Sequence, residues 1–150
     1  MSAYRQVTDD DIRKLIGDSI EKNFSHLTGC LIEPIFFNKK KMSKGKYQLA
    51  VLSKPNPLVK HLYEAVNGND LDYILFIDFN LYYELDEHDK ELAITHTLEY
   101  ADVDMDKSNP YTLRGAEVET FYDEIERTKE NQMWHQRHQD IASQFYTKDE

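Results

Sequence analysis

The sequence contains little cysteine and little glycine, and it has no long apolar run. Cys30 is its one cysteine, which excludes an intramolecular disulfide and a zinc cluster built on cysteines. Its five glycines are isolated, so no glycine-rich phosphate-binding loop is present. No stretch approaches the roughly 20 apolar residues of a membrane span, and the first residues lack the apolar run of a signal peptide. We therefore expect a soluble, cytoplasmic protein that does not bind membranes.

Positive charge is scarce in the second half of the chain. Residues 1–75 carry 11 Lys and Arg against 9 Asp and Glu, a net charge of +2, whereas residues 76–150 carry 7 against 19, a net charge of −12. Such an acidic field repels nucleic acid and attracts basic proteins, and salt screens it over a Debye length of about 8–10 Å. We expect a basic protein partner and no direct nucleic-acid binding. The plainer alternative is that the charge only keeps the protein soluble.

The first part of the chain predicts one helix followed by two strands. Thr8 and the three aspartates after it are typical of a helix start, and this helix runs to about residue 22. Residues 31–37 and 47–52 are short apolar runs of the kind found in strands. We expect these two runs to form a β-hairpin whose basic tip, Lys39 to Lys46, is solvated, with phosphate binding as the alternative.

The middle of the chain predicts a second helix and a central strand. Pro57 marks the helix start and Asn67-Gly68 its end. Residues 71–79 are almost continuously apolar, apart from Asp78 near their end, and this predicts a buried strand. Further helices are expected at 84–100, 115–130 and 132–146, with a loop or short strand at 102–111. This order predicts a single α+β domain around a small sheet.

The segment His96-Thr97-Leu98-Glu99-Tyr100 partly matches the zinc-binding motif His-Glu-x-x-His. In that motif two imidazoles one helical turn apart hold the metal, and the glutamate between them activates the bound water. Over roughly residues 20–127 the chain resembles the putative phage metallopeptidase family, whose fold is zincin-like. The segments that carry this resemblance are Phe24-Ser25-His26-Leu27, Lys44-Gly45-Lys46, Asp72-Tyr73-Ile74-Leu75-Phe76-Ile77-Asp78, residues 96–100, and Tyr111-Thr112-Leu113-Arg114-Gly115-Ala116-Glu117-Val118-Glu119-Thr120-Phe121.

The resemblance also identifies where this chain departs from the family. Thr97 stands in the place of the catalytic base, Tyr100 in that of the second ligand and Ala116 in that of a third. A threonine cannot act as a carboxylate base at neutral pH, and a vestigial His96 alone does not hold zinc. We therefore expect a pseudoenzyme without cofactor or metal, with residues 1–130 as the zincin-like domain and residues 131–150 as a C-terminal helical extension. Glu99 is a candidate substitute ligand or base, although a surface carboxylate is the favoured interpretation.

Carboxylates are dense along and after this segment, and Lys90 is the one cation among them. Between residues 84 and 106 there are nine acidic side chains. Self-repulsion in such a cluster costs stability unless a basic partner neutralises it, so we take them as the partner-binding surface. They are Glu84, Asp86, Glu87, Asp89, Glu91, Glu99, Asp102, Asp104 and Asp106.

Three functional hypotheses follow from these features. The leading one is a phage protein in the host cytoplasm that presents carboxylates in place of DNA phosphates and so inhibits a host DNA-binding protein, such as a nucleoid protein. The second is a residual or altered zinc metallopeptidase that uses His96, Glu99 and Asp102. The third is a structural or assembly protein, with the helix that carries Trp134 as a homodimer contact.

Other candidate sites are weaker. Asp102, Asp104 and Asp106 resemble the start of a calcium loop, but Lys107 stands where that loop requires glycine. His135 and His138 are close in sequence on the last helix, and we expect both to be surface residues. Cys30 with nearby His26 could form a nucleophilic pair, although an ordinary buried thiol is the favoured interpretation.

Overall fold

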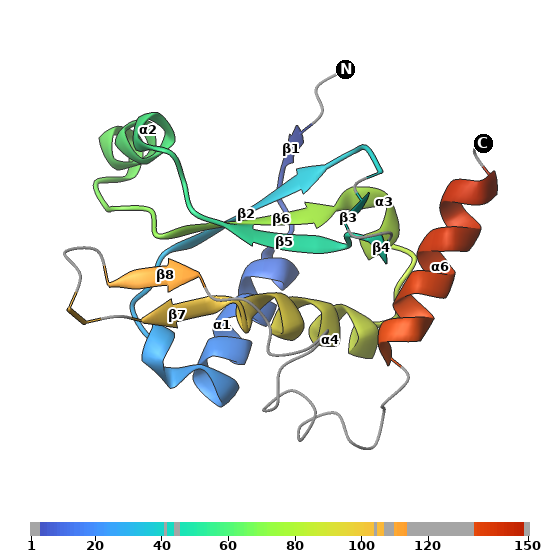
Figure 1. Cartoon of the computed structure of the whole chain (residues 1–150). Coiled ribbons are helices and arrows are strands. Elements are labelled where there is room, and N and C mark those ends of the chain that lie inside the picture. The colour runs from blue at the N-terminus through green and yellow to red at the C-terminus, as the bar shows by residue number, and fades with distance from the viewer. Residues whose placement is uncertain are drawn as a thin grey trace.

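A four-stranded mixed sheet lies at the centre of the fold (Figure 1). The computed structural model describes residues 4–40, 42–43, 46–103, 105–106, 110–113 and 134–148. In the strand order β1-β2-β6-β5, only β2 and β6 are parallel neighbours. The strand bounds are Tyr4–Gln6 for β1, Ile32–Phe37 for β2, Ala50–Ser53 for β5 and Tyr73–Asp78 for β6. This sheet and its helices confirm the predicted α+β class.

The predicted hairpin between residues 31–37 and 47–52 is wrong. Strand β6 lies between β2 and β5, and its Phe76 pairs with Ile35 on one side and Val51 on the other. Because β6 is almost continuously apolar, it is buried best at the centre of the sheet, with a strand on each side. It therefore lies between β2 and β5, and these two strands do not pair with each other as a hairpin. The lysine-rich connection forms a separate small hairpin instead. Its strands are Met42–Ser43 (β3) and Lys46–Tyr47 (β4).

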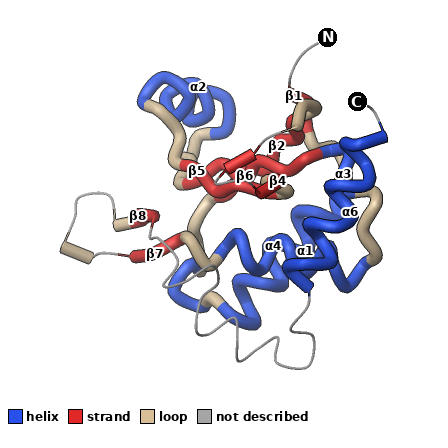
Figure 2. The backbone as a smooth tube through the Cα atoms, turned by 45° about the vertical axis from the view of Figure 1, so that its right-hand side comes forward, coloured by secondary structure: helices blue, strands red, loops and turns tan. Residues whose placement is uncertain are grey.

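Two long helices, α1 and α4, lie side by side on one face of the sheet (Figure 2). Their bounds are Asp10–Asn23 for α1 and Glu87–Leu98 for α4, with a 3-10 turn at Ser25–Leu27 after α1. The hydroxyls of Ser19 and Thr95 are 2.8 Å apart, and the Tyr83 hydroxyl donates to Asp9 Oδ2 over 3.4 Å. Both helices therefore begin at the same end of the molecule and run in the same direction. Asp9, and not Thr8, caps α1 by accepting from the Asp11 amide at 2.9 Å.

The main core fills the space between the sheet and these helices. Tyr73, Leu75 and Ile77 alternate along β6 with half-buried residues and are at most 1% exposed. They pack with apolar side chains of both helices, namely Ile12, Ile16, Ile94 and Leu98. This confirms that residues 71–79 contain a central buried strand.

The exception in that strand, Asp78, is completely buried. Its Oδ1 accepts hydrogen bonds from the amides of Asn80 at 3.0 Å and Leu81 at 3.1 Å, and so begins the short helix α3 (Phe79–Tyr82). Burial raises the pKa of this carboxyl, while the hydrogen bonds it accepts act in the opposite direction. Asp78 is thus the point at which the chain leaves the sheet for α3 and α4.

Helix α2, Pro57–Asn67, has the predicted ends but does not bury its apolar face in the described part of the protein. The Asn56 side chain caps it by accepting from the Val59 amide at 2.8 Å, and Gly68 ends it with a left-handed φ of 77°. No α2 residue is buried: Leu62 is 55% exposed and Val66 is 83% exposed. Figure 1 shows α2 at one end of the sheet, away from α1 and α4.

A second small hairpin follows α4 and is held by a side chain of the central strand. It consists of β7, Ala101–Val103, and β8, Tyr111–Leu113, in the segment predicted as loop or short strand. The Tyr73 hydroxyl donates to the carbonyl oxygen of Thr112 at 2.6 Å, and the rings of Tyr73 and Tyr111 lie edge to face with centroids 6.2 Å apart. The helix predicted at 115–130 lies outside the described residues.

The last helix, α6 (Trp134–Lys148), packs on the domain through a small second cluster. Its Ala142 and Tyr146 are buried with Leu81, and the Tyr146 ring stacks on Tyr47 with centroids 5.5 Å apart. The Tyr146 hydroxyl donates to Asp78 Oδ2 at 2.5 Å. The last helix therefore docks on the domain of its own chain. None of the described helices combines the length and the apolar character that crossing a membrane requires.

Charge also holds α6 in place. Asp89 of α4 is 2% exposed, and the Arg137 guanidinium donates to it through Nε, at 2.8 Å from Oδ2, and through Nη2 to Oδ1. The pKa of Asp89 is held below its usual range chiefly by Arg137, against the opposing effect of burial. His138, 8% exposed, places Nε2 at 3.7 Å from Asp89 Oδ1, so the expectation of a surface His138 is wrong. The His135 side chain lies outside the described set.

We predict opposite effects for two leucine truncations. Leu75→Ala, at a side chain that is 0% exposed, should lower the free energy of unfolding by about 2–5 kcal/mol because it opens a cavity in the core. Leu62→Ala should change it by less than about 0.5 kcal/mol because that side chain faces water. Urea denaturation of the two variants measures both values. Equal losses would contradict the exposed position of α2.

Asp89→Asn should destabilise the protein in a way that depends on pH. Because the folded pKa of Asp89 is lowered, its ionised form stabilises the fold above the unfolded pKa of about 3.9, and this contribution is lost as pH falls through the folded pKa. We expect a loss of roughly 1–3 kcal/mol at pH 7, allowing for the partial exposure of Arg137, and a smaller difference from the wild type below pH 4. Denaturation at several pH values measures it.

Glu33→Gln is the matched control for Asp89→Asn. It breaks the surface ion pair between Arg13 and Glu33, whose side chains are 42% and 22% exposed, and should cost less than about 1 kcal/mol. A pH-independent effect of Asp89→Asn, no larger than that of Glu33→Gln, would contradict the buried position of the Asp89 pair.

Candidate functional site

The motif at residues 96–100 lies at the C-terminal end of α4. His96 is in the last turn of the helix, and Tyr100 follows the helix in the turn before β7. Their rings meet nearly edge to face, with centroids 5.7 Å apart and an angle of 86° between the planes. The imidazole that the family motif would use as its first ligand therefore contacts an aromatic ring where the motif places a second imidazole.

The residue in the place of the catalytic base, Thr97, is buried in the interior of the protein. Thr97 is 3% exposed, and its hydroxyl donates to the carbonyl oxygen of Ala93 one turn earlier at 2.8 Å. That bond satisfies the hydroxyl within the helix, as buried threonines in helices commonly do. Thr97 therefore has a structural contact and carries no group that could accept a proton from water at neutral pH.

Glu99 differs from the favoured expectation, because it is 2% exposed and so is not a surface carboxylate. It is the C-cap of α4, where its amide donates to the His96 carbonyl oxygen at 3.1 Å, and the chain turns there directly into β7. A buried carboxylate thus lies three residues after His96, in the part of the motif that the altered-metallopeptidase hypothesis uses.

A catalytic zinc requires three protein ligands that lie close together. Among the ranges that the structure describes, no group of three His, Cys, Asp or Glu side chains lies close enough together to hold a metal ion. Ala116, in the place of the third ligand, lies outside those ranges. The described donors around His96 therefore do not fit a zinc site of the family type, and no step through a metal is derived from them.

The nine predicted partner-binding carboxylates do not form one surface. Asp89 and Glu99 are buried, so their assignment to that surface is corrected, and Asp89 is covered by Arg137 and His138 of α6. Asp104 lies outside the described residues. The others are exposed, and they fall at two places, the start of α4 and the β7–β8 hairpin. They are Glu84, Asp86, Glu87 and Glu91 at the first and Asp102 and Asp106 at the second.

Three acidic residues at the start of α1, the cap Asp9 and the first-turn residues Asp10 and Asp11, join three of the carboxylates at the start of α4. The Tyr83 hydroxyl, just before α4, donates to Asp9 Oδ2 over 3.4 Å, which brings the two helix starts together. In agreement, the carboxylates of Asp9, Glu87 and Asp11 raise the pKa of the neighbouring Tyr82 hydroxyl, after the larger effect of its burial. We call these residues the acidic end. It comprises Asp9, Asp10, Asp11, Glu84, Asp86 and Glu87.

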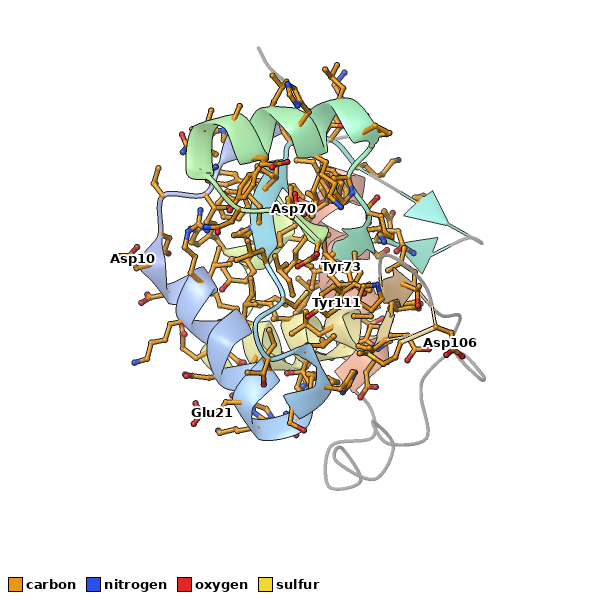
Figure 3. All side chains as sticks on the ribbon, turned by 90° about the vertical axis from the view of Figure 1, so that its left-hand side faces the viewer. Asp10, Glu21, Asp70, Tyr73, Asp106 and Tyr111 are labelled. Carbon is orange, nitrogen blue, oxygen red and sulfur yellow. The ribbon has the colours of Figure 1, made fainter. Side chains whose placement is uncertain are left out.

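Sequence reasoning missed the contribution of α1 to this surface. It interpreted residues 9–11 only as the start of a helix, which they are, and nothing in the sequence indicates that two helices start side by side. Each helix N-terminus favours nearby carboxylates by about 0.3–1 kcal/mol, which offsets part of their mutual repulsion. Figure 3 shows Asp10 at the opposite side of the molecule from Asp106, so the acidic end and the hairpin carboxylates are separate.

Lys90 and the exposed ring of Tyr83 lie within the acidic end. Lys90 Nζ is 3.2 Å from Glu87 Oε1 and lies over the rings of Tyr82 and Tyr83, at 5.1 and 5.4 Å from their centroids. Tyr83 remains 48% exposed. With six carboxylates and Lys90, the acidic end is strongly negative, which is an arrangement that can bind cationic side chains.

Cys30 behaves as the favoured interpretation expects. Burial raises the pKa of its thiol, and the neighbouring Asp72 raises it further by charge and by a hydrogen bond. A thiol in such surroundings stays protonated and unreactive at neutral pH. Asp72 also accepts from the Leu31 amide at 2.9 Å, so it has a structural function at the start of β2.

Comparison with known proteins gives one family. The family model described as putative phage metallopeptidase matches residues 4–146, which includes the sheet, the helices α1 to α4 and most of α6. No curated protein and no solved structure matches the chain. Because the match extends over nearly the whole chain, this protein belongs to the putative phage metallopeptidase family.

Proposed function

We propose that this chain is a non-catalytic member of its family that binds a basic host protein and inhibits it by presenting carboxylates in place of DNA phosphates. The partner class is a host DNA-binding protein, such as a nucleoid protein. The observation that carries the proposal is the acidic end, where acidic residues from two distant segments of the chain lie around Tyr82 and Tyr83.

The region of the family motif supports a function without catalysis. Thr97 is buried and bonded to the helix backbone, and Tyr100 packs its ring on His96. Neither side chain can replace the carboxylate base or the second imidazole of a zinc peptidase. Selection for proteolysis would not retain these residues, whereas a binding function places no requirement on them.

The charge of the acidic end supports a basic partner. Carboxylates held close together repel one another, and cations of a partner relieve that repulsion when they bind. DNA-binding proteins carry the complementary surface, because they neutralise phosphates with lysine and arginine. Binding of this kind weakens steeply as salt rises, which separates it from an apolar assembly contact.

An altered metallopeptidase is the second candidate function. Family membership favours it, as does the buried Glu99 close to His96 in sequence. In that case Glu99 and a second carboxylate would have to complete the coordination of zinc with His96. The two candidates make different predictions for metal binding and for salt dependence.

Neutralising the acidic end should weaken partner binding. The test variant is Asp10→Asn, Asp11→Asn, Glu84→Gln and Glu87→Gln together. The control removes the same charge elsewhere, with Asp18→Asn, Glu21→Gln, Asp102→Asn and Asp106→Asn. Each protein is immobilised and used to capture proteins from host lysate at low salt, with elution by duplex DNA or by about 0.5 M salt. We expect the wild type and the control to retain a DNA-binding protein that duplex DNA releases.

The test variant should retain at least about tenfold less of that protein, because the loss of four carboxylates removes most of the local field. Retention that is reduced equally in the test variant and in the control would show that overall charge alone is responsible. Capture that survives both duplex DNA and high salt would contradict DNA mimicry.

Zinc should not stabilise this protein through His96. A site whose Kd lies a hundredfold below the free zinc concentration raises the free energy of unfolding by about 2.7 kcal/mol. We expect zinc to change the Tm of the wild type and of His96→Ala by the same amount. His88→Ala, on the exposed side of the same helix, is the matched control. A shift that is present in the wild type and the control but absent in His96→Ala and Glu99→Gln would revive the metallopeptidase.

A further inference from the structure

The Arg137 guanidinium already occupies an acidic position beside the acidic end. It forms a two-pronged contact with Asp89, and the nearby Asp86 adds to the electrostatic field that raises the pKa of Arg137. Asp89 is three residues after Asp86, whose side chain accepts from the Asp89 amide at 2.8 Å. Arg137 thus shows which chemical group the start of α4 binds: a planar guanidinium held by both oxygens of a buried carboxylate.

The attachment of α6 is separate from the main core. Its buried apolar cluster comprises Leu81, Ala142 and Tyr146, which are not part of the cluster between the sheet and α1 and α4. The partly buried side chains of Tyr47, Leu49 and Phe145 pack against this second cluster. The Gln139 side-chain amide also exchanges two hydrogen bonds of 3.0 Å with the Tyr47 backbone. Among the described residues this cluster is smaller than the main core, and elements held by smaller buried clusters open locally at lower free energy than the core unfolds.

We propose that α6 is an autoinhibitory strap, in which Arg137 occupies the place of an arginine of the basic partner. This inference rests on the proposed function and adds to it the chemistry of the partner. In the free protein the strap is closed. A partner that inserts an arginine at Asp89 replaces Arg137, and α6 is released from α4, which joins Asp89 to the acidic end.

The exchange is favourable only for an arginine-bearing partner. Release of α6 without a replacement would remove both Arg137 hydrogen bonds from Asp89, take the Tyr146 hydroxyl away from the buried Asp78 and expose the cluster around Leu81, so the strap stays closed alone. An incoming guanidinium restores both hydrogen bonds to Asp89 and offsets that part of the cost, and the partner's other cations at the acidic end must supply the rest. A lysine ammonium cannot reproduce the two-pronged geometry. We expect a nona-arginine peptide to bind more tightly than a nona-lysine peptide of equal charge.

Hydrogen exchange followed by mass spectrometry on the full chain measures the opening of α6. Three variants separate the contributions. Arg137→Gln removes the internal guanidinium, Tyr146→Phe loosens α6 at its other end without changing charge, and Arg13→Gln removes the same charge as Arg137→Gln from the ion pair with Glu33. The first two should increase exchange in residues 134–148 by about tenfold while α4 stays protected, and Arg13→Gln should not.

Nona-arginine binding at low salt measures the consequence. Apparent affinity rises with the open fraction of the strap, so Arg137→Gln should bind the peptide about tenfold more tightly than Arg13→Gln, and Tyr146→Phe more tightly than the wild type. If the wild type binds but Arg137→Gln gains nothing over Arg13→Gln, or if α6 exchanges only together with α4, the strap is overturned and the acidic binding surface stands. If no variant binds the peptide, the acidic binding surface itself is overturned.

Discussion

The buried carboxylate of Asp78 joins the parts of this fold. It ends the central strand β6, its Oδ1 caps α3 through the amides of Asn80 and Leu81, and its Oδ2 accepts from the hydroxyl of Tyr146 in α6. A buried carboxyl is costly unless each oxygen has donors, and here both do. The sheet, the path from β6 into α4 and the docking of α6 all depend on this one side chain.

The position of α4 brings the charges of the protein together. Because α3 sends the chain back beneath the sheet, α4 begins beside the start of α1, as the contact between Tyr83 and Asp9 shows. Two helix N-termini at one end of the molecule favour carboxylates there, so capping residues and surface charge coincide. The end of α4 that carries the family motif lies at its other terminus. The proposed binding surface is therefore distinct from the place where the family would hold zinc.

Local signals predicted much of the fold. Pro57 and Asn67-Gly68 identified both ends of α2, and the apolar run at 71–79 identified the central strand. The pairing of strands was not predictable in this way, because β6 separates β2 from β5 although it follows both in sequence. The preference of an apolar strand for a central position is a property of the whole sheet.

The candidate site was also predicted only in part, because contacts between distant segments leave no local signal in the sequence. The acidic run from residue 84 onward was evident in the sequence, as was the altered motif at His96. Asp89 was assigned to the surface because its partner Arg137 is 48 residues away in sequence, and no local pattern connects them. The aspartates at residues 9–11 were interpreted as a cap, and only the parallel packing of α1 and α4 shows that they extend the acidic end.

Carboxylate footprinting tests the central claim most directly. Carbodiimide labelling, followed by mass spectrometry, compares the reactivity of each exposed carboxylate in the free protein and in complex with the captured DNA-binding protein. The account predicts protection of Asp10, Asp11, Glu84 and Glu87 in the complex, while Asp102 and Asp106 on the β7–β8 hairpin stay reactive. Protection at the hairpin with full reactivity at the acidic end would contradict it.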